Sequence, residues 1–218
     1  MHLLYDVAFL FGAVHNYHMR MDLHVHSTCS PCSRMTASEI LAHARARGLD
    51  GVCFTDHDTM DVLAQIREGF QSDGLFVAVG MEYATPQGDF LVFGNVESLQ
   101  CGLDGESLLC RVRDLGGAAV AAHPFRHARP VDPAVFDSGL CRLVEVDNGR
   151  NSAEENERGL SLALRRRMIQ VAGSDAHRLD ELGRRPTEFT VPVRCRADLV
   201  HALNNGLCHP ARSWQAAI

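Results

Sequence analysis

The sequence predicts an α/β fold in which about seven strands form a distorted (β/α)7, TIM-like barrel within a single domain. Apolar runs alternate with helical patterns along the chain, as in repeated βαβ units. The chain has 218 residues, which is shorter than the roughly 250 residues of an eight-fold barrel. Polar residues suited to chemistry also gather where the apolar runs end, and barrels place active sites at those ends. An open, doubly wound sheet is the alternative.

The expected elements follow from these patterns. Strands are expected at residues 21–25, 51–55, 75–81, 89–94, 118–122, 143–146 and 168–172, with a shorter run at 189–191. Helices are expected at 36–48, 59–70, 104–115, 152–166 and 197–204. Two of them begin with a capping box, Thr36 with Glu39 and Ser152 with Glu155.

Composition limits the protein's class and partners. Residues 1–20 look unlike the rest and are expected to be an N-terminal appendage to a domain at 21–218. The net charge of −6 argues against a duplex nucleic-acid partner. No export signal or membrane span is recognised, so the eight cysteines indicate a reducing cytoplasm. The sequence gives no indication of the oligomeric state.

The chain contains no lysine, so all 21 basic residues are arginine. A GC-rich genome is the simplest origin for this bias. Its chemical consequence is that neither a Schiff-base lysine nor a carboxylated lysine bridging two metals can occur. Any phosphate must be bound by arginine, backbone amides or metal.

Two histidines follow one apolar run in Asp22-Leu23-His24-Val25-His26. Side chains two apart on a strand point to the same face, so His24 and His26 should point together into one space. Buried imidazoles need polar partners, and neutral imidazole is a common metal ligand. The pair indicates half of a metal site, with hydrogen-bonded or surface histidines as the alternative.

The same placement recurs at the ends of other predicted strands: His57, Glu82, His123, Asp175 and His177. In a barrel these ends share one face, so five histidines and two carboxylates should converge there. Mixed imidazole and carboxylate ligands suit zinc, iron or manganese, and seven side chains are too many for one tetrahedral ion. We therefore expect two or three divalent ions (Zn, Mn or Fe), with a carboxylate bridging between them.

Two further residues need separate arguments. Asp89 begins its strand, but a tight return after Glu82 would bring it beside that residue, so it is either a ligand or an ordinary turn aspartate. Cys32 ends the motif Cys29-Ser30-Pro31-Cys32, which could be a redox pair, a source of one thiolate ligand, or two unreactive thiols. We favour Cys32 as a ligand of a third ion.

Arginines also follow the predicted ligands. Arg126 and Arg178 lie within three residues of His123 and His177, Arg150 follows Asn148-Gly149, and a guanidinium can bind two phosphate oxygens at once. They are candidate phosphate-binding residues, with salt-bridged loop arginines as the alternative. Three acids are expected to orient the ligand imidazoles: Asp22, Asp56 and Glu145.

Five motifs, in this order, resemble the polymerase-and-histidinol-phosphatase (PHP) family: Asp22-x-His24-x-His26, Thr55-Asp56-His57, Gly80-Met81-Glu82, Ala122-His123-Pro124 and Gly173-Ser174-Asp175-Ala176-His177. The resemblance extends over about residues 21–212. It implies a distorted (β/α)7 barrel with a two- or three-metal centre that hydrolyses phosphoesters.

The resemblance also implies a ligand set. His24, His26, Glu82 and Asp175 would hold one ion; Glu82, Asp89 and His123 a second, with Glu82 bridging; and His57 and His177 a third. Two positions depart from the family pattern. Asp89 stands where a histidine is usual, and Pro31 or Cys32 stands where the family has a histidine or aspartate ligand of the third ion.

The sequence therefore predicts a metal-dependent phosphoesterase that hydrolyses a phosphomonoester, or a short nucleotide phosphoester, with a metal-bound hydroxide. Its partner would be a small phosphorylated substrate. Glu82 as bridging ligand, Asp175, and His177 as a proton donor to the leaving oxygen are the expected catalytic residues. The alternatives are a non-catalytic, metal-binding regulatory module of this family and a single-metal amidohydrolase.

Overall fold

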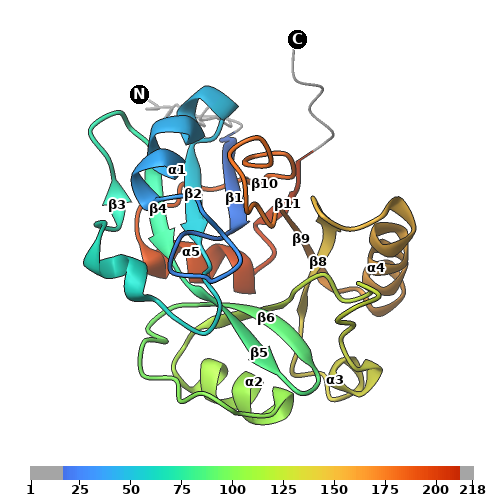
Figure 1. The fold of residues 1–218 in the computed structure, drawn as a ribbon. Coiled ribbons are helices and arrows are strands. Elements are labelled where there is room, and N and C mark those ends of the chain that lie inside the picture. The colour runs from blue at the N-terminus through green and yellow to red at the C-terminus, as the bar shows by residue number, and fades with distance from the viewer. Residues whose placement is uncertain (1–16, 212–218) are drawn as a thin grey trace, which may run out of the picture.

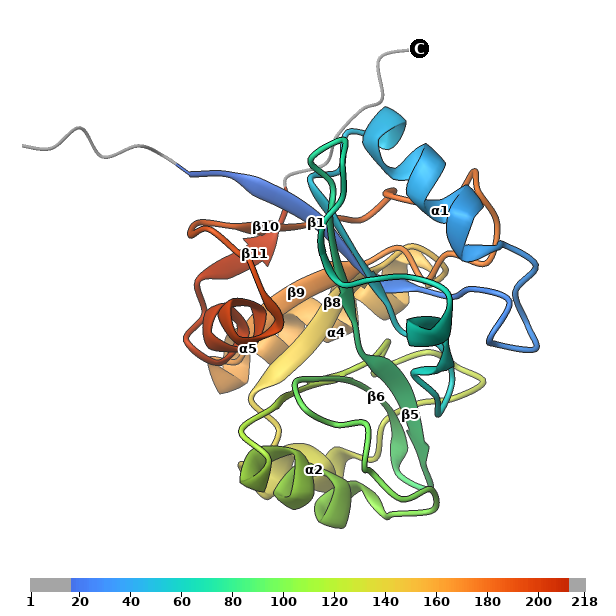
Figure 2. The same ribbon diagram turned by 90° about the vertical axis from the view of Figure 1, so that its left-hand side faces the viewer.

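In residues 17–211, which are the part of the chain that the computed structural model describes, strands and helices alternate around two sheets (Figures 1 and 2). The strands are β1 (Met19–Val25), β2 (Gly51–Phe54), β3 (Gly69–Phe70), β4 (Phe76–Val79), β5 (Met81–Thr85), β6 (Gly88–Phe93), β7 (Ala118–Ala121), β8 (Leu143–Asn148), β9 (Ile169–Gly173), β10 (Thr187–Phe189) and β11 (Cys208–Pro210). The helices are α1 (Ala37–Ala44), α2 (Gly105–Asp114), α3 (Pro133–Asp137), α4 (Ala153–Arg166) and α5 (Arg196–Asn204). Both predicted capping boxes are present and begin α1 and α4.

The first sheet has six strands in the order β11-β10-β1-β2-β4-β3, so β1 lies in its interior. β1, β2 and β4 are parallel to one another, while β10 runs antiparallel to β1. The second sheet has five strands in the order β5-β6-β7-β8-β9. Its pairs β5–β6 and β6–β7 are antiparallel, and β7–β8 and β8–β9 are parallel.

The two sheets meet at two places. Val25 at the end of β1 forms a parallel bridge with Ala176, and His57 forms one with Glu82. The backbone N–H of His26 donates to the carbonyl of Ala176 (3.0 Å), and the N–H of Glu82 donates to the carbonyl of Asp56 (3.1 Å). The α/β fold is confirmed, but these isolated bridges do not make one continuous closed sheet of the described strands. The closed (β/α)7 barrel stays a prediction.

The antiparallel hairpin β5–β6 departs from the strand–helix alternation of a regular barrel. The predicted strand at 75–81 is interrupted at Gly80, and Glu82 is the second residue of β5 rather than a residue beyond a strand end. A Cβ atom at Gly80 would lie 2.3 Å from the carbonyl oxygen of Val92. Glycine thus lets the chain change direction against β6, and the break places Glu82 beside the end of β2.

The helix predicted at 59–70 is wrong. A 3₁₀ turn at Asp61–Ala64 and the short strand β3 occupy this segment. The turn already buries Val62, and Glu68 is held at the sheet edge, where it accepts from the N–H of Val79 (2.7 Å) and from Arg196 (2.5 Å). The contacts that Glu68 makes with Val79 and Arg196 are therefore favoured over the hydrogen bonds of a helix in this segment.

Smaller differences concern one short helix and the two ends of the described chain. α3 and β11 are not among the predicted elements, and β10 ends where the predicted run at 189–191 begins. β1 begins at Met19, and Met19 pairs with Phe189, so the strand includes the last two residues of the expected appendage. Residues 1–16 of that appendage lie outside the described residues. No helix in the described part is long and apolar enough to cross a membrane.

The core has two clusters, each with residues from both sheets, and α5 belongs to one of them. Leu199 and Leu203 of α5 are fully buried in the same cluster as Leu23 of β1 and Leu91 of β6. The side chain of Asn204 donates to the carbonyl of Gly117, just before β7. α5 therefore packs at the amino end of β7, and Figure 2 shows it on the opposite side of the sheets from the loop that follows β1.

We expect Gly80→Ala to lower the free energy of unfolding by about 1–3 kcal/mol, because the added methyl group would overpack against the β6 backbone. Gly159→Ala is the matched control. In α4 a Cβ atom would make only ordinary contacts of 3.5 Å or more, so this change should stabilise the helix by about 0.5–1 kcal/mol. Urea unfolding measures both; a Gly80→Ala protein as stable as the parent would contradict this account of the break.

Candidate metal centre

Two imidazoles at the end of β1 begin the site. His24 and His26 are fully buried, and their Nε2 atoms lie 3.1 Å apart. Two basic nitrogens this close in a buried place need something positive between them or acids beside them. As predicted from their spacing, both rings point into the same space.

Glu82 lies at the centre of this space and is buried. Its Oε2 is 3.2 Å from Nε2 of His24, from Nε2 of His26 and from Nδ1 of His57. Its Oε1 is 2.8 Å from Nε2 of His123. One carboxylate thus meets four imidazoles, which come from three separate segments of the chain.

Asp175 and His177 approach from the end of β9. Oδ1 of Asp175 lies 3.3 Å from Nε2 of His26 and 3.6 Å from Nε2 of His24. Nδ1 of His177 donates to the carbonyl of Asp175 (2.8 Å), and its Nε2 lies 3.1 Å from Sγ of Cys32. A carbonyl can only accept, so the proton of neutral His177 is on Nδ1 and its Nε2 lone pair is available to a cation.

The donor atoms fall into three groups, each with its ligand atoms within 4.8 Å of one another. The groups are His24, His26 and Asp175; His24, Glu82 and His123; and His26, Cys32, His57 and His177. Imidazole, carboxylate and thiolate are ligands that zinc, iron and manganese accept in such mixtures. The residues therefore fit divalent transition-metal ions, and His24 and His26 are each shared by two of the groups.

His123 adds an independent sign of this fit. Its ring is buried, and its Nδ1 has no hydrogen-bond partner among the described residues. Its backbone is in a left-handed conformation, with φ 27°. An unsatisfied buried nitrogen and a strained backbone each cost free energy, and such costs are typical of functional sites.

Acids behind the ligands hold the rings in place. Oε1 of Glu145 lies 3.0 Å from Nδ1 of His24, and its Oε2 accepts from the N–H of His123 (2.8 Å) and the amide of Asn148 (2.9 Å). Glu145 therefore orients an imidazole, as expected from sequence. Asp22 instead accepts from the backbone of His24, Ser174 and Gly183.

Asp56 acts through Ser30, a residue that sequence reasoning missed. Ser30 Oγ donates to Asp56 (2.6 Å), accepts from the N–H of His57 (3.0 Å) and lies 3.2 Å from Nδ1 of His26. Its place in the turn after a predicted ligand strand was the available signal. Asn148 was missed too, although it stands at the end of β8, where the strand-end rule would have found it.

Asp89 is not among the three donor groups. It lies opposite Ala84 in the β5–β6 hairpin, not opposite Glu82. Both of its oxygens accept from Nε of Arg129 (2.9 Å), and Arg129 also donates to the carbonyl of Thr85 (3.0 Å). A guanidinium thus occupies the position next to Asp89, and the role of Asp89 as a ligand stays a prediction.

The three candidate phosphate-binding arginines differ in position. Arg126 reaches the centre, where its Nη2 donates to Oδ2 of Asp175 (2.7 Å) and to Oδ1 of Asn148 (2.8 Å). Arg150 pairs with Glu181 (3.3 Å). Arg178 pairs with Asp180, and 71% of its side chain is exposed.

Charges within the centre shift the pKa values of its residues. Burial alone would lower the pKa of His24, but Asp175, Glu82 and Glu145 raise it well above its usual value. Burial would raise the pKa of Glu82, yet the charge of His24 and hydrogen bonds from imidazoles hold it well below. The same balance between burial and neighbouring charges raises the pKa of His26 and lowers that of Asp175. The centre thus favours positive charge, whether as protons or as cations.

The sequence matches two family descriptions, the PHP domain over residues 22–119 and a PHP-associated region over residues 153–208. The chain belongs to the PHP family. The PHP-domain match contains His24, His26, His57 and Glu82, while Asp175 lies in the PHP-associated match. The two matched regions therefore build one centre together, with His123 contributed by the segment between them.

Two uncharacterized proteins of Methanocaldococcus jannaschii resemble this PHP protein in sequence. One is 28% identical over 139 residues, which are 59% of this chain and 77% of the relative. The other is 29% identical over 181 residues, 79% of this chain and 71% of the relative.

Solved structures show the same fold. PsfC from Pseudomonas syringae PB-5123 aligns with a TM-score of 0.75 at 21% identity, covering 91% of this chain and 93% of that one. A protein of Bifidobacterium adolescentis ATCC 15703, provisionally assigned as a metal-dependent phosphoesterase, aligns with a TM-score of 0.62 at 18% identity, covering 72% and 87%.

The pKa shifts predict how the stability of the chelated protein depends on pH. Histidines whose pKa is raised in the folded protein stabilise it at pH values below their unfolded pKa of about 6.5. This contribution is lost as the pH rises through the pKa values of the folded state. Carboxyl groups whose pKa is lowered in the folded protein stabilise it at pH values above their unfolded pKa of about 4.3. That contribution is lost only as the pH falls through the pKa values of the folded state. The melting temperature in chelator should therefore fall as the pH rises from about 6.5 to 9.

Excess Mn²⁺ or Zn²⁺ should abolish this fall, because metal ions bind deprotonated imidazole more tightly as the pH rises. His43→Gln, on the exposed face of α1, is the control and should keep the fall in chelator. Scanning calorimetry at several pH values measures the effect. A chelated protein that becomes more stable between pH 6.5 and 9 would contradict the assignment.

Proposed function

We propose that this PHP protein is a metal-dependent phosphoesterase that hydrolyses a phosphomonoester. The observation that carries the proposal is the contact of one buried carboxylate, Glu82, with four imidazoles. A carboxylate shared in this way suits a bridge between cations, and paired cations are the usual means of hydrolysing phosphate esters. The likeness in fold to a protein provisionally assigned as a phosphoesterase supports the same class.

In this proposal His24, His26, Glu82 and Asp175 hold one ion, and Glu82 and His123 contribute to a second. Asp89 would bind the second ion only after its hydrogen bonds with Arg129 are broken. Cys32, His57 and His177 surround a third. Bound divalent ions would polarise the phosphoryl oxygens and lower the pKa of the attacking water.

Arg126 is the arginine placed to bind the phosphate. Its guanidinium is held against Asp175 and Asn148, at the edge of the centre, and 23% of its side chain remains exposed. Its Nε also donates to Oδ1 of Asn151 (3.1 Å), so the guanidinium can present the N–H groups of its other terminal nitrogen, Nη1, to a phosphoryl oxygen at little cost in side-chain entropy. We propose a smaller contribution from Arg150, and none from Arg178.

His177 is the proposed proton donor for the leaving oxygen when it is not engaged as a ligand. Its Nδ1 is fixed on the carbonyl of Asp175, so in the imidazolium form Nε2, which lies 3.1 Å from Sγ of Cys32, carries the proton to be donated. Fixing one ring nitrogen sets both the tautomer and the ring orientation.

The proposal also includes a class of partner, a location in the cell and a barrel-like fold. A small phosphorylated molecule is the proposed partner, rather than duplex nucleic acid or a membrane. All eight cysteines lie in the described part and none is in a disulfide, which supports a reducing cytoplasm. The bridges at Val25–Ala176 and His57–Glu82 support a distorted barrel in which the two sheets act as one wall.

The experiment is turnover of an aryl phosphate monoester after reconstitution of the chelated protein with Mn²⁺, Zn²⁺ or Fe²⁺. Glu82→Gln should lose bound metal and lower kcat more than about 100-fold, since even the loss of a group supporting a ligand costs about 10–100-fold. Asp175→Asn should behave similarly, and circular dichroism checks that both variants fold.

Near-normal turnover by folded Glu82→Gln would refute the proposal. A parallel screen with aryl phosphodiesters and amides separates the alternatives. Turnover of amides alone with one ion per chain would identify a single-metal amidohydrolase. Bound metal with no turnover of any ester or amide would identify a regulatory module.

Arg126 and Arg178 differ in whether they contact the centre. Arg126→Gln should lower kcat/KM for the phosphomonoester about 10- to 100-fold, because a charge-assisted hydrogen bond contributes about 1.5–3 kcal/mol. Arg178→Gln removes an equal charge at the exposed pair with Asp180 and should stay within about twofold of the parent. Equal effects of the two changes on kcat/KM would mean that only the general positive field matters.

A further inference from the structure

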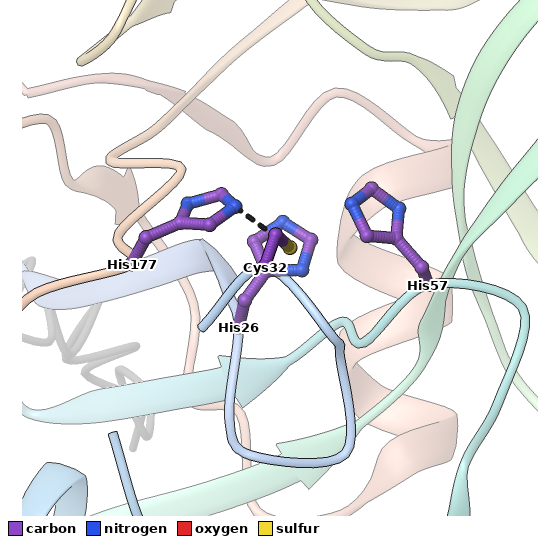
Figure 3. A group of neighbouring side chains, drawn as sticks. All are labelled: His26, Cys32, His57 and His177. Atoms are coloured by element: carbon purple, nitrogen blue, oxygen red, sulfur yellow. Dashed lines mark hydrogen bonds between the residues drawn. The ribbon is translucent and has the colours of Figure 1, made fainter. Parts of the chain in front are cut away.

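The loop between β1 and α1 carries a cysteine to the edge of the metal centre. Figure 3 shows His177 and His57 on opposite sides of Cys32 and His26. Sγ of Cys32 lies 3.1 Å from Nε2 of His177. The ring centre of His26 lies 4.5 Å from that of His177 and 4.6 Å from that of His57. Four side chains that can bind metal thus face one another at the solvent side of the site.

The loop is held in this conformation by a buried acid. Asp56 accepts from the N–H of Ser27 (2.7 Å), from Ser27 Oγ (2.7 Å) and from Ser30 Oγ (2.6 Å). Ser33 Oγ donates to the carbonyl of His26 (2.8 Å). With both sides of the turn anchored, Cys32 is fixed relative to His26 and His57 before any ligand binds, so little ordering remains to be done on binding.

We propose that Cys32, His57 and His177 form a thiolate-containing metal position that selects Zn²⁺ or Co²⁺ over Mn²⁺, beside imidazole–carboxylate positions that do not share this preference. Thiolate sulfur is a soft ligand that strengthens zinc binding, whereas carboxylates suit manganese and magnesium. One sulfur and two nitrogens leave a fourth tetrahedral position, to be taken by His26 or by a small molecule. The centre would then hold two different metals.

Two other readings of Cys32 fit the geometry less well. A catalytic Cys–His pair needs one base, but here three imidazoles gather around a single sulfur. A redox pair needs Cys29, yet the sulfur of Cys29 accepts from Nε2 of Gln65 (3.3 Å), a residue outside the donor group. Cys29 is therefore the natural control, because it shares the loop and the motif without sharing the site.

The test is titration of the chelated, reduced protein with Co²⁺, followed by absorption spectroscopy and metal analysis. The parent should develop a near-ultraviolet thiolate-to-cobalt charge-transfer band that reaches its full height with one ion per chain. Cys29→Ser should keep the band. Cys32→Ser should lose the band and one bound ion, while keeping the remaining ions and the circular dichroism of the fold.

Cys32→Asp supplies an oxygen ligand of similar reach. It should recover the bound ion without the band, and shift the preference of that position from Zn²⁺ toward Mn²⁺ in competition. A band that survives in Cys32→Ser, or that disappears equally in Cys29→Ser, would overturn the proposal, as would a parent protein with no band. None of these readouts uses turnover, so they decide the metal position even if the substrate is not a phosphomonoester.

Discussion

The contact between the Glu82 carboxylate and its four imidazoles is the constraint on which the rest of this structure depends. A buried carboxylate without partners costs several kcal/mol, and the three buried imidazoles, His24, His26 and His123, would add to that cost if they had no partners. The cost is offset only when all these groups meet with positive charge among them. The polypeptide must therefore bring the ends of β1, β2 and β7 and the start of β5 to one point.

Two glycines make this meeting sterically possible. Gly80 lets the chain break between β4 and β5, so that Glu82 lies beside His57. At Gly173 a Cβ atom would lie 2.4 Å from Cβ of His24 and 2.4 Å from Oε1 of Glu145. β9 can therefore approach the pair formed by His24 and Glu145 only where a side chain is missing. Close packing behind the ligands therefore restricts the position of the His24 ring in addition to its hydrogen bond with Glu145.

The part of the centre that sequence could predict is the part set by local rules. Alternation along β1 indicates that His24 and His26 share a face, and the strand-end rule indicates His57, His123 and Asp175. Asp89 shows where such rules stop, because its partner Arg129 comes from a loop 40 residues later and no periodicity encodes that pairing. The false helix at 59–70 has the same cause, since Glu68 is bound by a distant arginine.

The position of β1 has a consequence for how the protein is made. The strand that bears His24 is synthesised before the other strands of the described residues, yet one of its edges pairs with β10 and its end bridges to Ala176. Both partners are synthesised about 150 or more residues later, since Val25 bridges to Ala176 and Met19 pairs with Phe189. Folding thus requires pairing between distant parts of the sequence, which slows it and leaves an unpaired strand edge exposed in the nascent chain. Production of intact protein should depend on the synthesis of residues 176–189 before that edge pairs with another strand.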